Sequence, residues 1–176
     1  PYSAGLNFAK SRREWILSQR QPAARLAAGQ AIGKAHRLTF KPKTTIAKPA
    51  SRMAAGEVVV SYPPHLGIDD PEVQKAAREG GIRALRAQAE QLLPQRLASL
   101  AQAHGFDYAS VSIKHLKSRW GSCDQDRNIV LNLFLMQLPV RYIDYVLLHE
   151  LTRTRIGRHA NTASPSRTST PAPLRP

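Results

Sequence analysis

The chain has 176 residues, 42% of them hydrophobic, which suits one folded domain and excludes a wholly disordered protein. A single cysteine, Cys123, excludes an intramolecular disulfide and an all-cysteine zinc site. No apolar run approaches the roughly 20 residues of a membrane-spanning helix, so we expect a cytoplasmic protein without membrane contact. The net charge of +14 raises the hypothesis of nucleic-acid binding.

The positive charge is concentrated at the two ends of the chain. Residues 1–56 carry eleven Lys or Arg against one acid, whereas residues 57–151 carry ten against eleven. Residues 152–176 add five Arg and no acid. The middle of the chain is therefore almost neutral, and a nucleic-acid-binding fold would more naturally carry its charge on one face of its core.

The N-terminal third predicts one helix followed by short strands. Phe8, Trp15 and Ile16 fall at roughly helical spacing, which predicts an amphipathic helix over residues 6–19. An Arg-rich targeting peptide over residues 1–28 is the alternative interpretation. Short strands are predicted by apolar or β-branched runs between Gly and Pro turns, at residues 38–40, 44–46 and 57–62.

A long helical segment follows. Asp70, Pro71 and Glu72 form a typical helix start, because Asp caps free N–H groups and Pro is tolerated in the first turn. The helical pattern continues to about Gln102, with predicted weak points or breaks at residues 80–81, where two glycines stand, and at Pro94.

The C-terminal third predicts two strands, a last helix and a tail. Strands are predicted from Tyr108 to Ile113 and over residues 129–133, and Pro139 opens the helix. Residues 160–176 contain six Ser or Thr and four Pro, a composition that predicts disorder. We therefore expect one domain over residues 1–159 and a disordered tail over residues 160–176. The apolar stripe of the last helix consists of Ile143, Val146, Leu147 and Leu151.

The adjacent pair His149-Glu150 in this helix matches the first two residues of the H-E-x-x-H motif of zinc hydrolases. In that motif, two His four residues apart share one Zn²⁺, and the Glu lies beside the metal-bound water as general base. Position 153, where the second His belongs, is Arg153, which has no lone pair to donate. His159, ten residues after His149, is a candidate further ligand.

Several blocks around this pair match a known family in order and spacing. They are Lys117-Ser-Arg-Trp-Gly-Ser-Cys123, Asn128-Ile-Val-Leu-Asn132, Leu135, Pro139 and residues 143–151. Together they resemble the YgjP-like zinc metallopeptidases, which are related to gluzincins and, more distantly, to SprT-like proteins. The resemblance implies a small zincin-like α+β domain with a mixed or antiparallel sheet packed on helices, one of which carries the active site.

The same resemblance implies the chemistry. His149 and a downstream His, here His159, are the implied zinc ligands, Glu150 is the implied catalytic base, and a peptide or protein is the implied substrate. The family has His where this chain has Arg153, and its Asn-His-Ser block and aromatic pair are absent after Leu151. That loss is typical of a reading-frame change or a divergent terminus. Because Arg153 replaces the second His, we expect weak or absent zinc binding and catalysis.

Four more residues are candidates for lining the site. Arg119 and Asn132 are candidates for positioning the helix or a substrate, although solvated turn residues explain them equally well. For Trp120, lining the site and packing in the core are both open interpretations. Tyr145 is a candidate for offering its phenol to an oxyanion, although core packing is the simpler interpretation. The alternatives to a peptidase are a basic, non-enzymatic nucleic-acid-associated protein and an inactive remnant.

Overall fold

The computed structural model describes the backbone of residues 25–160 and the side chains of residues 25–155. The predictions for the helix over residues 6–19, for a targeting peptide and for the tail over residues 161–176 lie outside these residues. Among the described residues, no helix combines the length and apolar character that crossing a bilayer requires. In chain order the elements are β1 (Ala31–Ile32), β2 (His36–Pro42), β3 (Ala50–Ala54), β4 (Glu57–Tyr62), α2 (Pro71–His104), β5 (Ser110–Lys114), β6 (Gly121–Cys123), β7 (Asn128–Asn132), the 3-10 helix η1 (Leu133–Gln137) and α3 (Val140–Ala160).

The strands form two separate sheets. The first has the order β1-β2-β4-β3, with β2 and β4 parallel and the outer pairs antiparallel. Its centre is apolar because Leu38 lies opposite Val58, and both side chains are buried. The second sheet has the order β5-β7-β6, with β6 antiparallel to β7. The mixed sheets and long helices confirm the predicted α+β class.

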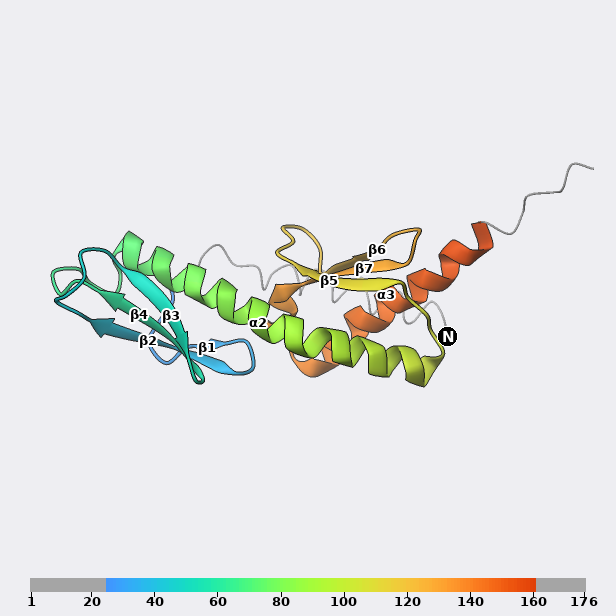
Figure 1. Cartoon of the computed structure of the whole chain (residues 1–176), viewed down its shortest axis with the longest axis horizontal. Coiled ribbons are helices and arrows are strands. Elements are labelled where there is room, and N and C mark those ends of the chain that lie inside the picture. The colour runs from blue at the N-terminus through green and yellow to red at the C-terminus, as the bar shows by residue number, and fades with distance from the viewer. Residues whose placement is uncertain (1–24, 161–176) are drawn as a thin grey trace, which may run out of the picture.

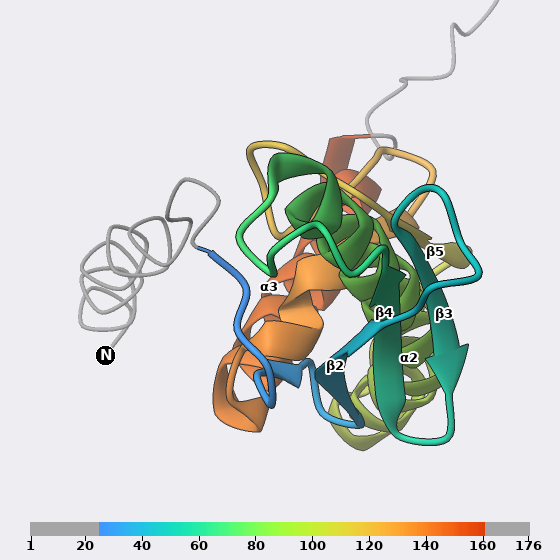
Figure 2. The ribbon, with the colours of Figure 1, turned by 90° about the vertical axis from the view of Figure 1, so that its left-hand side faces the viewer.

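Helix α2 is the element that both sheets share. It runs along the length of the molecule, with the first sheet beside its N-terminal half and the second beside its C-terminal half (Figure 1). Figure 2 shows β2, β3 and β4 in front of the helix, seen from the end that carries the first sheet. Asp70 caps its first turn by accepting a 2.8 Å hydrogen bond from the Glu72 N–H, and Gly105 ends it in the left-handed region at φ 64°.

The predicted breaks in this helix are wrong, because α2 is continuous over 34 residues and includes Pro94. Gly80 is buried against the first sheet, where a Cβ would lie 2.7 Å from Val58 Cγ1 and 2.9 Å from Ser51 Cβ. The missing side chain therefore allows helix and sheet to approach closely, a role that propensity alone does not predict.

Two buried glutamines on α2 hold the chain just before the first sheet and its β1–β2 hairpin. Gln74 accepts from the Leu26 N–H and donates to the Leu26 carbonyl, at 2.9 and 3.0 Å. Gln88 accepts from the Lys34 N–H at 2.6 Å and donates to the Ile32 carbonyl at 2.9 Å. Both amides thus pair with backbone groups of this segment and tie it to α2.

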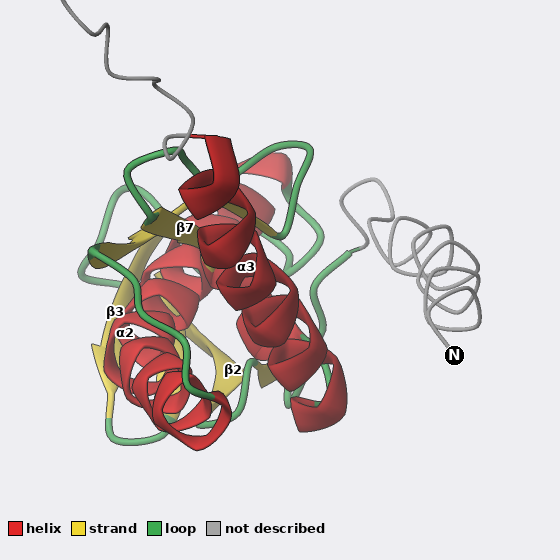
Figure 3. Ribbon diagram, turned by 90° about the vertical axis from the view of Figure 1, so that its right-hand side faces the viewer, coloured by secondary structure: helices red, strands yellow, loops and turns green. Residues whose placement is uncertain are grey.

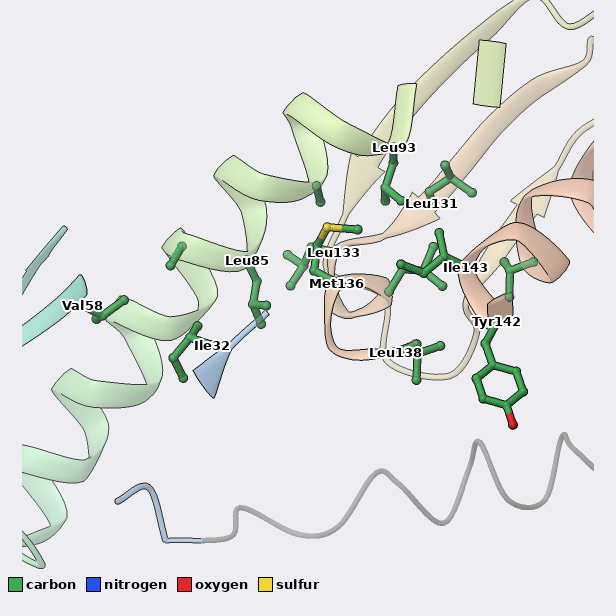
Figure 4. Close-up of a cluster of buried hydrophobic side chains, with 14 of the residues drawn as sticks. Ile32, Val58, Leu85, Leu93, Leu131, Leu133, Met136, Leu138, Tyr142 and Ile143 are labelled. Atoms are coloured by element: carbon green, nitrogen blue, oxygen red, sulfur yellow. The ribbon is translucent and has the colours of Figure 1, made fainter. Parts of the chain in front are cut away.

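The core continues from the first sheet to α3 (Figure 4). Leu85 and Leu93 of α2 belong to the same buried cluster as Ile32, Leu131 and Ile143. Burial of these aliphatic side chains stabilises the arrangement of α2 beside α3, which Figure 3 shows from the right-hand side of Figure 1.

The short elements differ most from the sequence predictions. Residues 44–46 form a turn, so the predicted strand there is wrong, and β3 lies a few residues later. The two-residue β1 and the three-residue β6 were not predicted as strands, since neither has a hydrophobic pattern long enough to read. The strand predicted at 57–62 is confirmed with the same bounds, and those at 38–40, 108–113 and 129–133 are confirmed with shifted ends.

The two adjacent helix glycines provide a test of this packing. Gly81→Ala should raise the free energy of unfolding by up to about 1 kcal/mol, because Ala is the better helix former and its Cβ would meet Ile32 at an ordinary 3.8 Å. Gly80→Ala should instead lower it by about 1 kcal/mol or more, since overpacking outweighs the gain in propensity. Urea denaturation measures both variants, and equal stabilisation by the two would contradict the close contact with Val58 and Ser51.

Candidate active site

Two contacts fix helix α3 against α2, one near the start of α3 and one near residue 155. Near its start, Arg96 of α2 forms a bidentate ion pair with Asp144, with both N–O distances at 2.7 Å. Near residue 155, the Arg155 guanidinium donates to the Gly105 carbonyl at 2.8 Å and lies 4.4 Å from the centre of the Phe106 ring. These contacts set the helical face on which His149 and Glu150 stand.

Glu150 points into the protein rather than into solvent. Only 5% of its surface is exposed, and it lies against Gly121 of β6. A Cβ at Gly121 would lie 2.9 Å from Glu150 Cγ and 3.0 Å from Oε1, so only glycine leaves room for this carboxylate. The glycine in the Trp-Gly-Ser-Cys block therefore has a packing role that the sequence analysis missed. A glycine inside a strand is the signal for such a close approach.

The carboxylate of Glu150 is incompletely satisfied. Its Oε2 atom is buried, and no donor among the described residues forms a hydrogen bond with it. Burial raises the pKa of Glu150, and the positive charges of Arg153 and then Arg119 partly oppose the increase. A buried carboxylate in this state needs a nearby cation or a proton.

Arg153 supplies the nearest described cation. Its Nε lies 3.7 Å from Glu150 Oε2, one helical turn further along α3. The distance makes this an ion pair without a hydrogen bond. The Arg153 side chain is 53% exposed, so its charge is partly screened by water.

His149 lies on the exposed side of the same turn. Its ring stacks on Tyr145, with centroids 6.3 Å apart and planes inclined by 22°. Partial desolvation, and then the positive charge of Arg153, lower the pKa of His149. Both effects favour the neutral imidazole, which is the form that can donate a lone pair to a metal. Tyr145 thus contacts the candidate ligand His149.

Arg119 belongs to the loop that leads into β6, and Asn132, the last residue of β7, holds that loop. Asn132 is fully buried, and its amide donates to the Leu116 and Arg119 carbonyls at 2.9 and 2.8 Å. Its backbone N–H donates to the Trp120 carbonyl at 2.9 Å, so Asn132 holds the loop through three hydrogen bonds. Arg119 is exposed, and its charge acts on Glu150. Trp120 packs against the core cluster.

Cys123, at the end of β6, shares the electrostatic environment of Glu150. Burial, and then the charges of Glu150 and Asp124, raise the pKa of the Cys123 thiol, while Arg153 opposes the increase. A thiol shifted in this direction is a poor nucleophile. This environment fits a cysteine that packs against the core rather than one that reacts.

His159 is placed far along the same helix. Helix α3 continues to Ala160, so His159 follows His149 by ten helical residues, a rise of about 15 Å. Sharing one ion with His149 would require the chain after Leu151 to leave the helix. Among residues 25–155, no three His, Cys, Asp or Glu side chains are placed to hold one metal ion. The described residues therefore do not form the ligand set that zinc requires.

Comparison with known proteins supplies the family. The model of the YgjP-like metallopeptidase domain matches residues 2–162. The chain belongs to the YgjP-like metallopeptidase family. No curated protein and no solved structure gave a significant match. The predicted resemblance to this family is thus confirmed, and Glu150 lies in the helix that the resemblance assigned to the active site.

The buried carboxylate predicts a pH-dependent effect of Glu150→Gln. Because burial raises the pKa of Glu150, the folded protein keeps a proton that the unfolded chain releases, so wild-type stability falls as the pH rises through that range. Glu150→Gln should therefore raise the free energy of unfolding at neutral pH, with a gain that shrinks as the pH falls and the wild-type carboxyl becomes protonated.

Urea denaturation across a pH series measures this difference. Glu79→Gln, at an exposed position of α2, is the matched control for loss of one negative charge. A Glu150→Gln effect that is the same at every pH would show that burial of the charge is not its cause.

Proposed function

We propose that this YgjP-like metallopeptidase-family protein retains the helix and the carboxylate of a peptidase centre, but binds zinc weakly or not at all. The observation that supports the proposal is the ion pair between Arg153 and the buried Glu150. Residue 153 stands four residues after His149, so the two side chains lie on the same helical face. A guanidinium then occupies the position that a second imidazole ligand requires.

Arg153 disfavours metal binding in two ways. It places a permanent positive charge beside Glu150, within reach of any cation that His149 would bind. It also offers no lone pair, because guanidinium stays protonated and only donates. The buried carboxylate already has a counter-charge, so a cation would gain less from binding beside it than in a site with His at this position.

The remaining residues keep roles that need no metal. Gly121 and Asn132 hold β6 and its loop against α3, and Tyr145 holds the ring of His149. We propose Glu150 as the residue that accepts a proton in any hydrolysis that persists, and a peptide or protein as the substrate class. His149 and His159 are the proposed ligands, His159 only where the chain after Leu151 leaves helix α3, and residues 1–159 are the proposed domain.

Substitution at one position tests the proposal. Purified wild-type protein should contain much less than one zinc per chain, and Arg153→His should raise zinc content at least about tenfold, because a His at i+4 completes a two-imidazole face. Elemental analysis after dialysis against low zinc measures both proteins. His149→Ala in the Arg153→His background should abolish the gain.

Arg153→Gln is the matched control, because it removes the charge without adding a ligand. A zinc gain with His and none with Gln would assign the defect to the missing imidazole, and equal gains would assign it to charge. Stoichiometric, tightly held zinc in the wild-type protein would overturn the proposal. Peptide hydrolysis that accompanies zinc in Arg153→His would support Glu150 as the base.

A further inference from the structure

The surplus positive charge of the described residues is concentrated in the segment that forms the first sheet. Residues 25–62 carry seven Lys or Arg against one acid, Glu57, whereas residues 63–155 carry twelve against ten. All seven cations are exposed. The sheet lies at the left-hand end of the molecule in Figure 1. A surplus of exposed charge on one element is typical of a surface that binds a polyanion.

The strand register places three of these cations on one face. Val58 lies against Gly80 of α2, and its register partners on β2 and β3 share that face. Side chains alternate between the two faces along each strand. The opposite face, here called the outer face, therefore carries Arg37 and Lys41 of β2 and Arg52 of β3.

The positive charge of the outer face is not neutralised within the described chain. No ion pair among residues 25–155 includes Arg37, Lys41 or Arg52. Arg37 donates to the Gly29 carbonyl at 3.1 Å, and its guanidinium has further N–H groups to offer. Glu57 is the one acid at the strand positions of this face, so three cations against one acid leave a surplus of positive charge facing solvent.

The spacing of the three cations favours one kind of polyanion. Arg37 and Lys41 are four residues apart on β2, about 13 Å, and Arg52 lies two strands away, about 10 Å across the sheet. These separations are close to the width of a DNA major groove, about 12 Å, so the cations can reach phosphates on both of its edges. An extended acidic peptide follows a single line and would meet fewer of the three.

We propose that the outer face binds the phosphate backbone of a double-stranded nucleic acid without reading its sequence. The aromatic residues of β2 and β4, Phe40 and Tyr62, alternate with the outer positions and lie on the side of α2. The outer face therefore offers no ring for stacking on unpaired bases, which single-strand binding uses.

This surface is separate from the candidate active site. Glu150 lies against Gly121 of β6 in the second sheet, whereas the outer face belongs to the first sheet. Binding of a duplex there needs neither a metal nor the proposed hydrolysis.

Removal of the three outer-face charges tests the proposal. The triple variant Arg37→Gln, Lys41→Gln and Arg52→Gln should bind a labelled DNA duplex of about 20 base pairs at least about tenfold more weakly than the wild type at about 50 mM salt. The slope of the logarithm of affinity against the logarithm of salt concentration should also become shallower by about 2 to 3, because each lost phosphate contact contributes about 0.9. Fluorescence anisotropy over a series of salt concentrations measures both quantities.

The matched control removes three exposed cations outside the first sheet, in the triple variant Lys75→Gln, Lys114→Gln and Lys117→Gln. Its net charge equals that of the outer-face variant, and it should keep the wild-type slope. Lys41→Gln alone should lower the slope by about 1, which keeps the test decisive if the outer-face triple variant does not fold.

A loss confined to the outer-face variants supports the proposal. Equal losses in the two triple variants would overturn it, because overall charge rather than this face would then govern binding. Wild-type protein that does not bind the duplex at low salt would overturn it as well. Tighter binding to polyglutamate or to a single strand than to the duplex would also contradict it, since the partner would then be an acidic protein or an unpaired nucleic acid.

Discussion

The burial of one carboxylate organises the C-terminal half of this protein. Glu150 is inside the fold because Gly121 presents bare backbone to it, and Gly121 is held in place by the loop that Asn132 fixes. Helix α3 must then lie at a fixed distance from β6. The bonds from Arg96 to Asp144 and from Arg155 to Gly105 hold α3 against α2 at that position. An ionised carboxylate at such a position destabilises the fold unless a cation faces it.

In a metallopeptidase, a metal ion at this position provides positive charge as part of the catalytic centre. In this chain the described residues do not gather a metal-ligand set, and the cation beside Glu150 is the guanidinium of Arg153. We propose that Arg153 provides positive charge beside Glu150 without offering a metal ligand. Under this proposal the fold of the family can persist in a chain that binds little or no metal.

The sequence predicted the parts of the fold that local physics controls. The Asp70-Pro71 start, the buried Val58–Val60 strand and the α3 stripe follow from capping and periodicity, and spaced motifs predicted the family. Tertiary proximity escaped prediction. Gly80 was predicted to be a weak point of the helix and Gly121 was given no role, but each allows a close approach to a neighbouring element. The ion pair of Arg153 also escaped prediction. The sequence showed that Arg153 stands in place of a His, but not that its partner Glu150 is buried.

A double-mutant cycle on the pair tests most directly the claim that Arg153 takes over the charge balance of Glu150. The free energy of unfolding is measured at pH 7 and low salt for the wild type, Arg153→Gln, Glu150→Gln and the double variant. The account predicts that Arg153→Gln destabilises the wild type but not the Glu150→Gln protein, with a coupling of about 0.5 kcal/mol or more. Equal effects of Arg153→Gln in both backgrounds would show that the guanidinium does not stabilise the buried carboxylate.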